Sequence, residues 1–292
     1  MRDAILILLL ISSISLQAQN TFWQKSDTLD LKKQKTLIIA ETSAYAVSMT
    51  GLYQLWYAKY PKSSFHTIND NAEWLQMDKM GHAMTSYYVG KMGMDLIKWT
   101  GNSKKNQLIY GAGLGFAFLT TVEIFDGFSK EWGFSTGDII ANASGTTLLI
   151  GQELLWKEQR IQFKYSFHQT AFANQNPDLL GHNLLEQSLK DYNGQTYWLS
   201  ANIWSFNKQT KIPKWLNVAI GYGAENMVSG YSLDNNNRYR QFYLSLDLDL
   251  TKIKTKSKFL KNVFSTVNFI KIPAPTLSYS KEAKFKFHYL YF

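Results

Sequence analysis

The stretch Glu123–Gly145, E-I-F-D-G-F-S-K-E-W-G-F-S-T-G-D-I-I-A-N-A-S-G, ends one apolar segment and begins the next. Glu123 and Asp126 close the first segment, and Asp138 and Asn142 open the second. The spacings i,i+3 and i,i+4 put each pair on one face of a helix. If the two segments are antiparallel helices, these four polar side chains lie at the same end of a helical bundle.

A second polar signature, Asp78-Lys79-Met80-Gly81-His82, opens the apolar segment upstream of these two. Asp78 and His82 are again spaced i,i+4, and antiparallel packing brings them to the same end of the bundle. We therefore expect one polar cluster that binds a ligand at this end. Its members are Asp78, Lys79, His82, Glu123, Asp126, Ser135, Asp138 and Asn142.

Apolar segments of about twenty residues predict a bundle of about four helices in the first half of the chain. They are Leu37–Tyr57, Asp78–Trp99, Asn106–Phe128 and Thr136–Gln159. Such lengths suit membrane spans, but charged residues such as Glu41 and Glu153 make the segments only moderately hydrophobic. We expect a bundle that is buried in a membrane or lies against one. Gly111, Gly113 and Gly115 favour close helix packing over a nucleotide-binding loop, because no strand precedes them.

The apolar period changes from 3.6 to 2 at about Arg160, which predicts an antiparallel β-rich region of about seven strands. The predicted strands are Ile161–His168, Thr196–Phe206, Leu216–Ala224, Arg240–Leu250, Val263–Lys271, Thr276–Ser280 and Lys284–Phe292. The fold class is therefore α+β, with a helical bundle over residues 21–159 and a basic β-rich region over residues 160–292. The sheet is either barrel-like and membrane-embedded or a soluble sheet docked to the bundle.

The N-terminus, residues 1–20, has the pattern of a secretory signal peptide. Arg2 precedes an apolar run that is too short to span a bilayer, and Gln17-Ala18-Gln19 is a plausible cleavage site. A single uncleaved anchor is the alternative. The chain contains no cysteine, which excludes disulfides and a lipid-modified cysteine. We expect a protein of the cell envelope, in the outer membrane or the periplasm.

Charge is distributed unevenly along the 292 residues. The first 158 residues carry 14 basic and 14 acidic side chains, whereas the rest carry 17 and 8, so the whole net charge of +9 lies in the second half. In an exported, aromatic-rich chain this excess suits a membrane lipid or lipopolysaccharide surface better than nucleic acid. Solubility is the alternative role for any one of these lysines.

Each residue of the expected cluster also has a structural explanation. Asp78 fits a helix N-cap, and Ser135–Asp138 fits the [ST]-x-x-[DE] capping box. His82 fits a satisfied interior histidine and Asn142 a hydrogen bond between helices. Two functional roles compete with these structural explanations. One is divalent-metal binding or acid–base chemistry at His82, Glu123 and Asp138, and the other is binding of a polar headgroup. No H-x-x-x-H or H-E-x-x-H spacing occurs, so the sequence assigns no metal and no cofactor.

The combined order D-K-x-x-H, a glutamate ending an apolar helix, and S-x-x-D-x-x-x-N-x-x-G resembles the VanZ-like family of small helical membrane proteins. It is more similar to the YfiM-like domain of unknown function of bacterial envelope proteins. The matching positions are Asp78, Lys79, His82, Glu123, Ser135, Asp138, Asn142 and Gly145. The resemblance covers about Leu37 to Gln159. It implies an envelope protein, usually a lipoprotein, and it implies no particular reaction.

Two functions follow as hypotheses. The first is a structural or headgroup-binding protein of the outer membrane, with a polar pocket in the bundle and a basic β half that engages the membrane. The second is a membrane-associated hydrolase or transferase acting on a lipid or cell-wall precursor. No cysteine nucleophile is present to favour the enzyme. Enzymatic activity is therefore left open.

Overall fold

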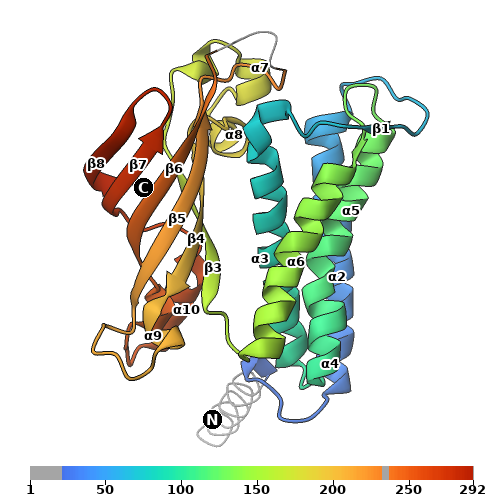
Figure 1. Cartoon of the computed structure of the whole chain (residues 1–292). Helices are drawn as coiled ribbons and strands as arrows, with labels where there is room; N and C mark the ends of the chain where they lie inside the picture. The colour runs from blue at the N-terminus through green and yellow to red at the C-terminus, as the bar shows by residue number, and fades with distance from the viewer. Residues whose placement is uncertain (1–21, 232–236, 292) are drawn as a thin grey trace, which may run out of the picture.

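The computed structural model describes residues 22–231 and 237–291, and the predicted signal peptide lies outside them. Within this part of the chain, helices make up the N-terminal half and a six-stranded antiparallel sheet makes up most of the rest (Figure 1). The predicted α+β class is confirmed. The bundle and the sheet stand side by side, with the helices α3 (Met77–Trp99) and α6 (Thr136–Leu155) nearest to the strand β3 (Ile161–Phe167) (Figure 1).

The bundle contains the four predicted helical segments with shifted ends. They are α2 (Leu31–Leu52) with η1 (Tyr53–Tyr57), α3 (Met77–Trp99), α4 (Lys104–Asn106) with η3 (Gln107–Ala112) and α5 (Gly113–Gly127), and α6 (Thr136–Leu155). The first helix starts earlier than expected because Asp30 is its N-cap and accepts hydrogen bonds from the amides of Lys32 and Lys33. The stretch Lys104–Gly127 is long and apolar enough to cross a membrane, a property that core helices of soluble proteins share.

Small residues let α3 approach its neighbours closely, as the sequence predicted. A Cβ added at Gly115 would lie 2.0 Å from the carbonyl oxygen of Ser86, and one at Gly145 would lie 2.0 Å from that of Ala83. Gly113, in contrast, has no atom within 4 Å of such a Cβ. The backbones of α5 and α6 therefore contact α3 directly at Gly115 and Gly145, while Gly113 faces open space.

The loop before α3 pairs with the loop before α6. β1 (Thr67–Ile68) runs parallel to β2 (Phe134–Ser135), with Thr67 opposite Phe134 and Ile68 opposite Ser135. This short pairing brings Asp70, just after β1, beside the start of α6. Sequence periodicity carries no signal for such a contact, because each strand has only two residues.

A left-handed turn leads from η2 (Glu73–Gln76) into α3. Trp74, Leu75 and Gln76 have φ values of 47°, 50° and 66°, a region that non-glycine residues rarely adopt. The sheet holds this turn in place: the Tyr222 hydroxyl donates to the Leu75 carbonyl, and Arg240 donates to the Gln76 side chain at 2.8 Å. The β half thus fixes the point at which α3 begins.

The sheet has the order β3-β4-β5-β6-β7-β8, and every neighbouring pair is antiparallel. Its strands are β3 (Ile161–Phe167), β4 (Gln195–Asn202), β5 (Leu216–Glu225), β6 (Tyr239–Leu248), β7 (Ala274–Ser280) and β8 (Lys284–Tyr291). The connections contain η4 (Phe172–Asn174), α7 (Pro177–Leu180), α8 (Leu184–Lys190), α9 (Ile203–Phe206), η6 (Leu250–Lys252) and α10 (Lys258–Val267).

Two strand predictions were wrong in part or in full. The expected strand Val263–Lys271 is largely helical, because Ser257 caps α10 and the apolar residues Phe259, Leu260, Val263 and Phe264 recur at helical spacing. The expected strand Thr196–Phe206 ends at Asn202, whose side chain caps α9. The sheet therefore has six strands where seven were expected.

The sheet is strongly curled. The rings of Trp198 on β4 and Tyr291 on β8 lie 6.2 Å apart although these strands are not neighbours. Polar groups such as Lys164, Ser200 and Asp247 are buried on the inside of this curl. Among the described residues β3 and β8 remain the two edges, so the sheet is open and the barrel-like alternative, with its strands closed into a ring, is not found.

The outside of the curl is apolar. Its residues next to α3 are covered, since Tyr87 packs against Phe163 with ring centroids 5.6 Å apart and Tyr88 donates to the Phe163 carbonyl. Farther from α3 the same face stays exposed. We call this surface the outer apolar face; its members are Ile220, Phe242, Leu244, Leu246, Leu277, Tyr279, Phe285 and Phe287.

Candidate functional site

Lys79, in the first turn of α3, lies among three carboxylates. Its Nζ is 2.6 Å from Asp70 Oδ2, 2.9 Å from Asp78 Oδ2 and 3.1 Å from Asp138 Oδ1. Burial alone would lower the pKa of Lys79, but Asp78 and Asp138 outweigh it and raise this pKa, so the ammonium stays charged. One cation therefore holds together the start of α3, the start of α6 and the loop that contains Asp70.

His82, one turn farther along α3, faces the bundle. Its Nδ1 lies 3.0 Å from Asn142 Oδ1 and 3.7 Å from Glu123 Oε1, and its Nε2 lies 4.0 Å from Asp138 Oδ1. Asn142 and Glu123 are almost fully buried. The hydrogen bond between His82 and Asn142 joins α3 to α6, which agrees with the structural explanation for Asn142.

The start of α6 is an incomplete capping box. Ser135 is the N-cap and accepts a hydrogen bond from the Asp138 amide at 3.1 Å. In a capping box the Asp138 carboxylate would return to the Ser135 amide, but Glu123 Oε2 accepts that hydrogen bond at 3.1 Å. The Asp138 carboxylate is consequently left to Lys79 and His82. Asp78 is likewise no N-cap, since α3 begins at Met77 after Gln76.

Several carboxyl groups of the cluster retain protons more readily than usual. Burial, followed by the charges of Asp138 and Asp126, raises the pKa of Glu123 to about 9. Burial also raises the pKa of Asp126 to about 7 and that of Asp138 to about 6. Asp70 differs: hydrogen bonds from Lys79 and Ser135 outweigh its burial and lower its pKa. The cluster thus combines fixed charges with groups that titrate near neutral pH.

All eight sequence-predicted residues lie at one end of the bundle, near β1 in Figure 1. Two residues that contact them were missed. Asp70 binds Lys79 and accepts a hydrogen bond from the Ser135 hydroxyl at 2.6 Å, and Tyr57 donates to Asp126 at 2.8 Å. Asp70 lies in the polar stretch Asn69-Asp70-Asn71, which resembles an ordinary turn, so the sequence offered no signal for it.

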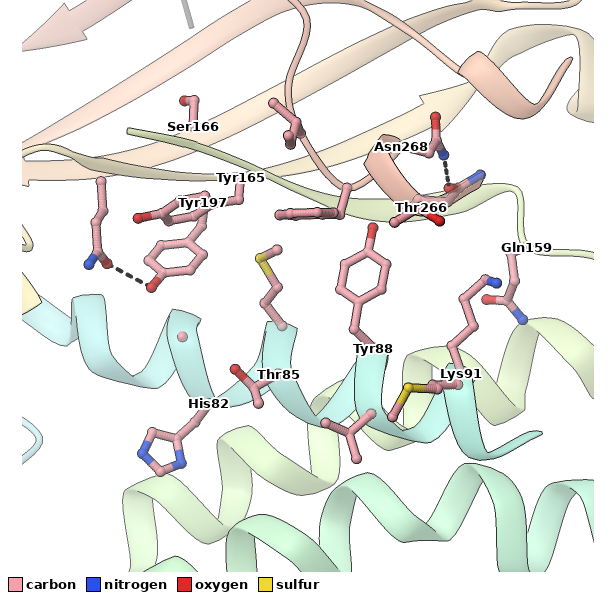
Figure 2. Close-up of a pocket in the computed structure, with 18 of the residues that line it drawn as sticks. His82, Thr85, Tyr88, Lys91, Gln159, Tyr165, Ser166, Tyr197, Thr266 and Asn268 are labelled. Carbon is pink, nitrogen blue, oxygen red and sulfur yellow. Dashed lines mark hydrogen bonds between the residues drawn. The ribbon is translucent and has the colours of Figure 1, made fainter. Parts of the chain in front are cut away.

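A cleft borders the cluster. It encloses about 1580 Å³ and runs along α3 from Asp78 to Asp95, against β3 and the segment that follows α10. It exposes mainly apolar surface, from residues that include Met84, Tyr88 and Phe269, and its lining also contains charged residues such as Asp95 and Lys252. Figure 2 shows Tyr88 pointing from α3 toward the sheet, whereas His82 lies on the other side of the helix. Asp78 and His82 both belong to the lining, so one end of the cleft borders the polar cluster.

The short helices α9 and α10 lie at the opposite end of the molecule from the cluster (Figure 1), and basic and aromatic residues occur together around them. Lys214 Nζ lies 4.1 Å from the centre of the Trp204 ring, and Arg160 lies 4.9 Å from that of Trp156. We call the exposed lysines of the loop before α10 and of its first turn, Lys254, Lys256 and Lys258, the basic edge. Phe259 is exposed beside them.

A family model described as a predicted periplasmic lipoprotein, DUF2279, matches residues 67–151. This stretch contains Asp70 and all eight predicted cluster residues, and it ends before the sheet begins. The match supports an uncharacterised domain of the cell envelope; it does not establish the YfiM-like or VanZ-like resemblance. No curated protein and no solved structure matches the chain.

Proposed function

We propose that this protein is a lipid-binding protein of the cell envelope, associated with the outer membrane. The observation that carries this proposal is the cleft along α3, which exposes mainly apolar surface, with Asp78 and His82 at one end and charged residues such as Asp95 and Lys252 at the other. An amphiphile likewise combines an apolar chain with a polar headgroup. We further propose that the polar cluster binds the headgroup of this lipid.

The dimensions of the cleft suit a lipid. Its volume of about 1580 Å³ exceeds the roughly 300–1,000 Å³ of sites for small molecules. The helical rise between Asp78 and Asp95 corresponds to a length of about 25 Å. One leaflet of a bilayer, headgroups included, is about 20 Å thick. A single lipid lying along α3 would therefore fill the cleft with its headgroup beside the cluster.

Two surfaces support contact with a membrane. The outer apolar face exposes eight large apolar side chains on one side of the sheet, while the other side buries polar groups. This is the polarity of a sheet that faces hydrocarbon and not water. The basic edge, with Phe259 beside it, suits anionic headgroups. The match to an envelope family agrees with this location.

The test is lipid retention by the full-length protein. We expect about one lipid per chain after purification and gel filtration, detected by mass spectrometry of the extracted sample. Thr85 is an exposed residue of α3 that lines the cleft, so Thr85→Trp should fill part of it. This variant should retain at least about tenfold less lipid, which corresponds to about 1.4 kcal/mol.

The matched control is Lys98→Trp, an exposed position on the same helix that is absent from the lining of the cleft. It should retain lipid as the wild type does. Equal lipid content in the wild type and both variants would show that the lipid binds elsewhere, and no bound lipid at all in the wild type would contradict the proposal.

A membrane-associated hydrolase or transferase is the second candidate. The observation that favours it is His82 between Glu123 and Asp138, whose raised pKa values suit proton transfer near neutral pH. Turnover of a lipid or lipid-linked cell-wall precursor that Glu123→Gln abolishes, with the fold preserved, would establish this candidate over simple lipid binding.

A further inference from the structure

The cluster contains two groups of three possible metal ligands that share Asp138. In each group the ligand atoms lie within 4.8 Å of one another. The first group, Asp70, Asp78 and Asp138, already surrounds the Lys79 ammonium. The second group is His82, Glu123 and Asp138. Among the ion pairs of the described residues, Lys79 pairs with Asp138 but not with the other two members of this second group. The second group is therefore not centred on the ammonium as the first group is.

Glu123 supplies an independent sign that something binds to the second group. Its side chain is only 1% exposed, and its Oε2 is fixed by the Ser135 amide at 3.1 Å. Its other oxygen, Oε1, has no hydrogen-bond partner in the described part of the chain and lies 3.7 Å from His82 Nδ1. Buried carboxylate oxygens are rarely left in this state without a bound group.

Asn142 orients the imidazole for ligation. Its Oδ1 lies 3.0 Å from His82 Nδ1 and accepts a hydrogen bond from the N–H group of that nitrogen. In the neutral ring this leaves the lone pair on Nε2, the nitrogen that lies 4.0 Å from Asp138 Oδ1. An amide or carboxylate that holds the second nitrogen is the usual support for a metal-bound histidine.

We propose that His82, Glu123 and Asp138 hold a divalent metal ion of the zinc or manganese class. One imidazole nitrogen and two carboxylate oxygens suit these ions. Three carboxylates, those of Asp70, Asp78 and Asp138, surround the single Lys79 ammonium, so the cluster attracts a second cation despite the ammonium nearby. Asp78 and His82 also line the cleft, which provides a route for the ion.

This site does not depend on whether the cleft binds a lipid. Its three ligands come from α3, α5 and α6, so metal binding can be measured on the wild-type protein in the absence of lipid.

The experiment uses the full-length protein after removal of metal with a chelator. Titration with Zn²⁺ and Mn²⁺ by calorimetry should give one site per chain for at least one of these ions. His82→Ala and Glu123→Gln should each weaken binding about a hundredfold or more, since even supporting residues of metal sites are worth about 10–100-fold.

The control is His182→Ala. His182 and Asp178 form an exposed i,i+4 pair 3.1 Å apart, which is the arrangement that binds metal adventitiously on a surface. This variant should bind like the wild type. A stoichiometry near zero, or binding lost in His182→Ala but retained in His82→Ala, would overturn the proposal. If the cluster variants fail to fold, NMR of the wild type provides the second measurement: His82 ring resonances that do not respond to Zn²⁺ would overturn the proposal as well.

Discussion

Lys79 illustrates how much depends on single charges in this molecule. Its side chain is 11% exposed and contacts Asp70, Asp78 and Asp138 at the same time. Buried charges are costly to remove from water, and they are tolerated when partners surround them. Removal of this ammonium would leave three carboxylates that repel one another.

Lys79→Met should lower the free energy of unfolding by about 3–5 kcal/mol, because it strands buried partners of opposite charge. Urea denaturation followed by circular dichroism measures this change. Lys91→Met is the matched control, since Lys91 pairs with Asp95 on the surface of the same helix and exposed pairs contribute only about 0.2–1 kcal/mol. Similar losses in the two variants would contradict the central role of Lys79.

Glu123 should make stability depend on pH. Its pKa is about 9 in the folded protein and about 4.5 in an ordinary environment, so the folded state binds the extra proton between these values. Its contribution is fully present below pH 4.5 and is lost as the pH rises toward 9. Asp126 and Asp138 act in the same direction at lower pH, because burial raises their pKa values too.

We therefore expect the metal-free wild type to lose stability from pH 5 to pH 8, and Glu123→Gln to lose less over the same range. Urea midpoints at the two pH values provide the measurement. Asp70 has a lowered pKa, but its effect falls below its usual titration range and leaves this window unaffected. A wild type that becomes more stable toward pH 8 would show that Glu123 is ionised throughout.

At the scale of elements, the helices of the bundle meet through glycines at defined positions. The carbonyl of Ser86 occupies the space that a Cβ at residue 115 would need, whereas residue 113 faces open space. Gly115→Ala should therefore destabilise the protein by about 1–3 kcal/mol through overpacking of α3 against α5. Gly113→Ala should be neutral or stabilising by up to about 1 kcal/mol, because alanine favours a helix.

Each of the two glycine variants adds one methyl group to the same helix, so a comparison of their urea midpoints reports on packing at the two positions. Equal behaviour of the two would mean that α5 and α3 are not in backbone contact. At the same scale, the bundle depends on the sheet: Tyr222 and Arg240 hold the left-handed turn before α3. The helix that carries Asp78, Lys79 and His82 is thus positioned by two strands, β5 and β6, that are far away in the sequence.

At the scale of the whole molecule, charge and apolar surface are separated. The polar cluster lies at one end of the bundle and the basic edge at the opposite end of the sheet (Figure 1). Lysines near an anionic membrane contribute about 1 kcal/mol each. Replacing the three lysines of the basic edge with glutamate should then weaken binding to vesicles that contain anionic lipid by about a hundredfold or more.

Vesicle flotation over a range of salt concentrations measures this binding. The control replaces the exposed lysines Lys59, Lys62 and Lys130, near the polar cluster, with glutamate and thereby makes the same change in net charge. It should bind nearly as the wild type does. Complete release of the wild type by high salt would show that charge alone holds the membrane, and the outer apolar face would then have no role in lipid contact.

The sequence by itself determined the elements and their polarity. Helical spacing identified the four helical segments, alternation identified six of the strands, and i,i+3 and i,i+4 spacing identified the polar residues that end one helix and begin the next. These are local properties, set by which side of a single element each residue faces. The error at Val263–Lys271 arose where a short apolar run fits either period.

Only the tertiary structure decided which residues meet. Asp70 reaches Lys79 because two-residue strands pair across the bundle, and Tyr57 reaches Asp126 because two helix ends lie together. The curl of the sheet, which buries its polar side and leaves an apolar face outside, is likewise a sum of contacts between distant strands. Periodicity along one segment contains no information about such contacts, because they depend on the free energy of the assembled chain.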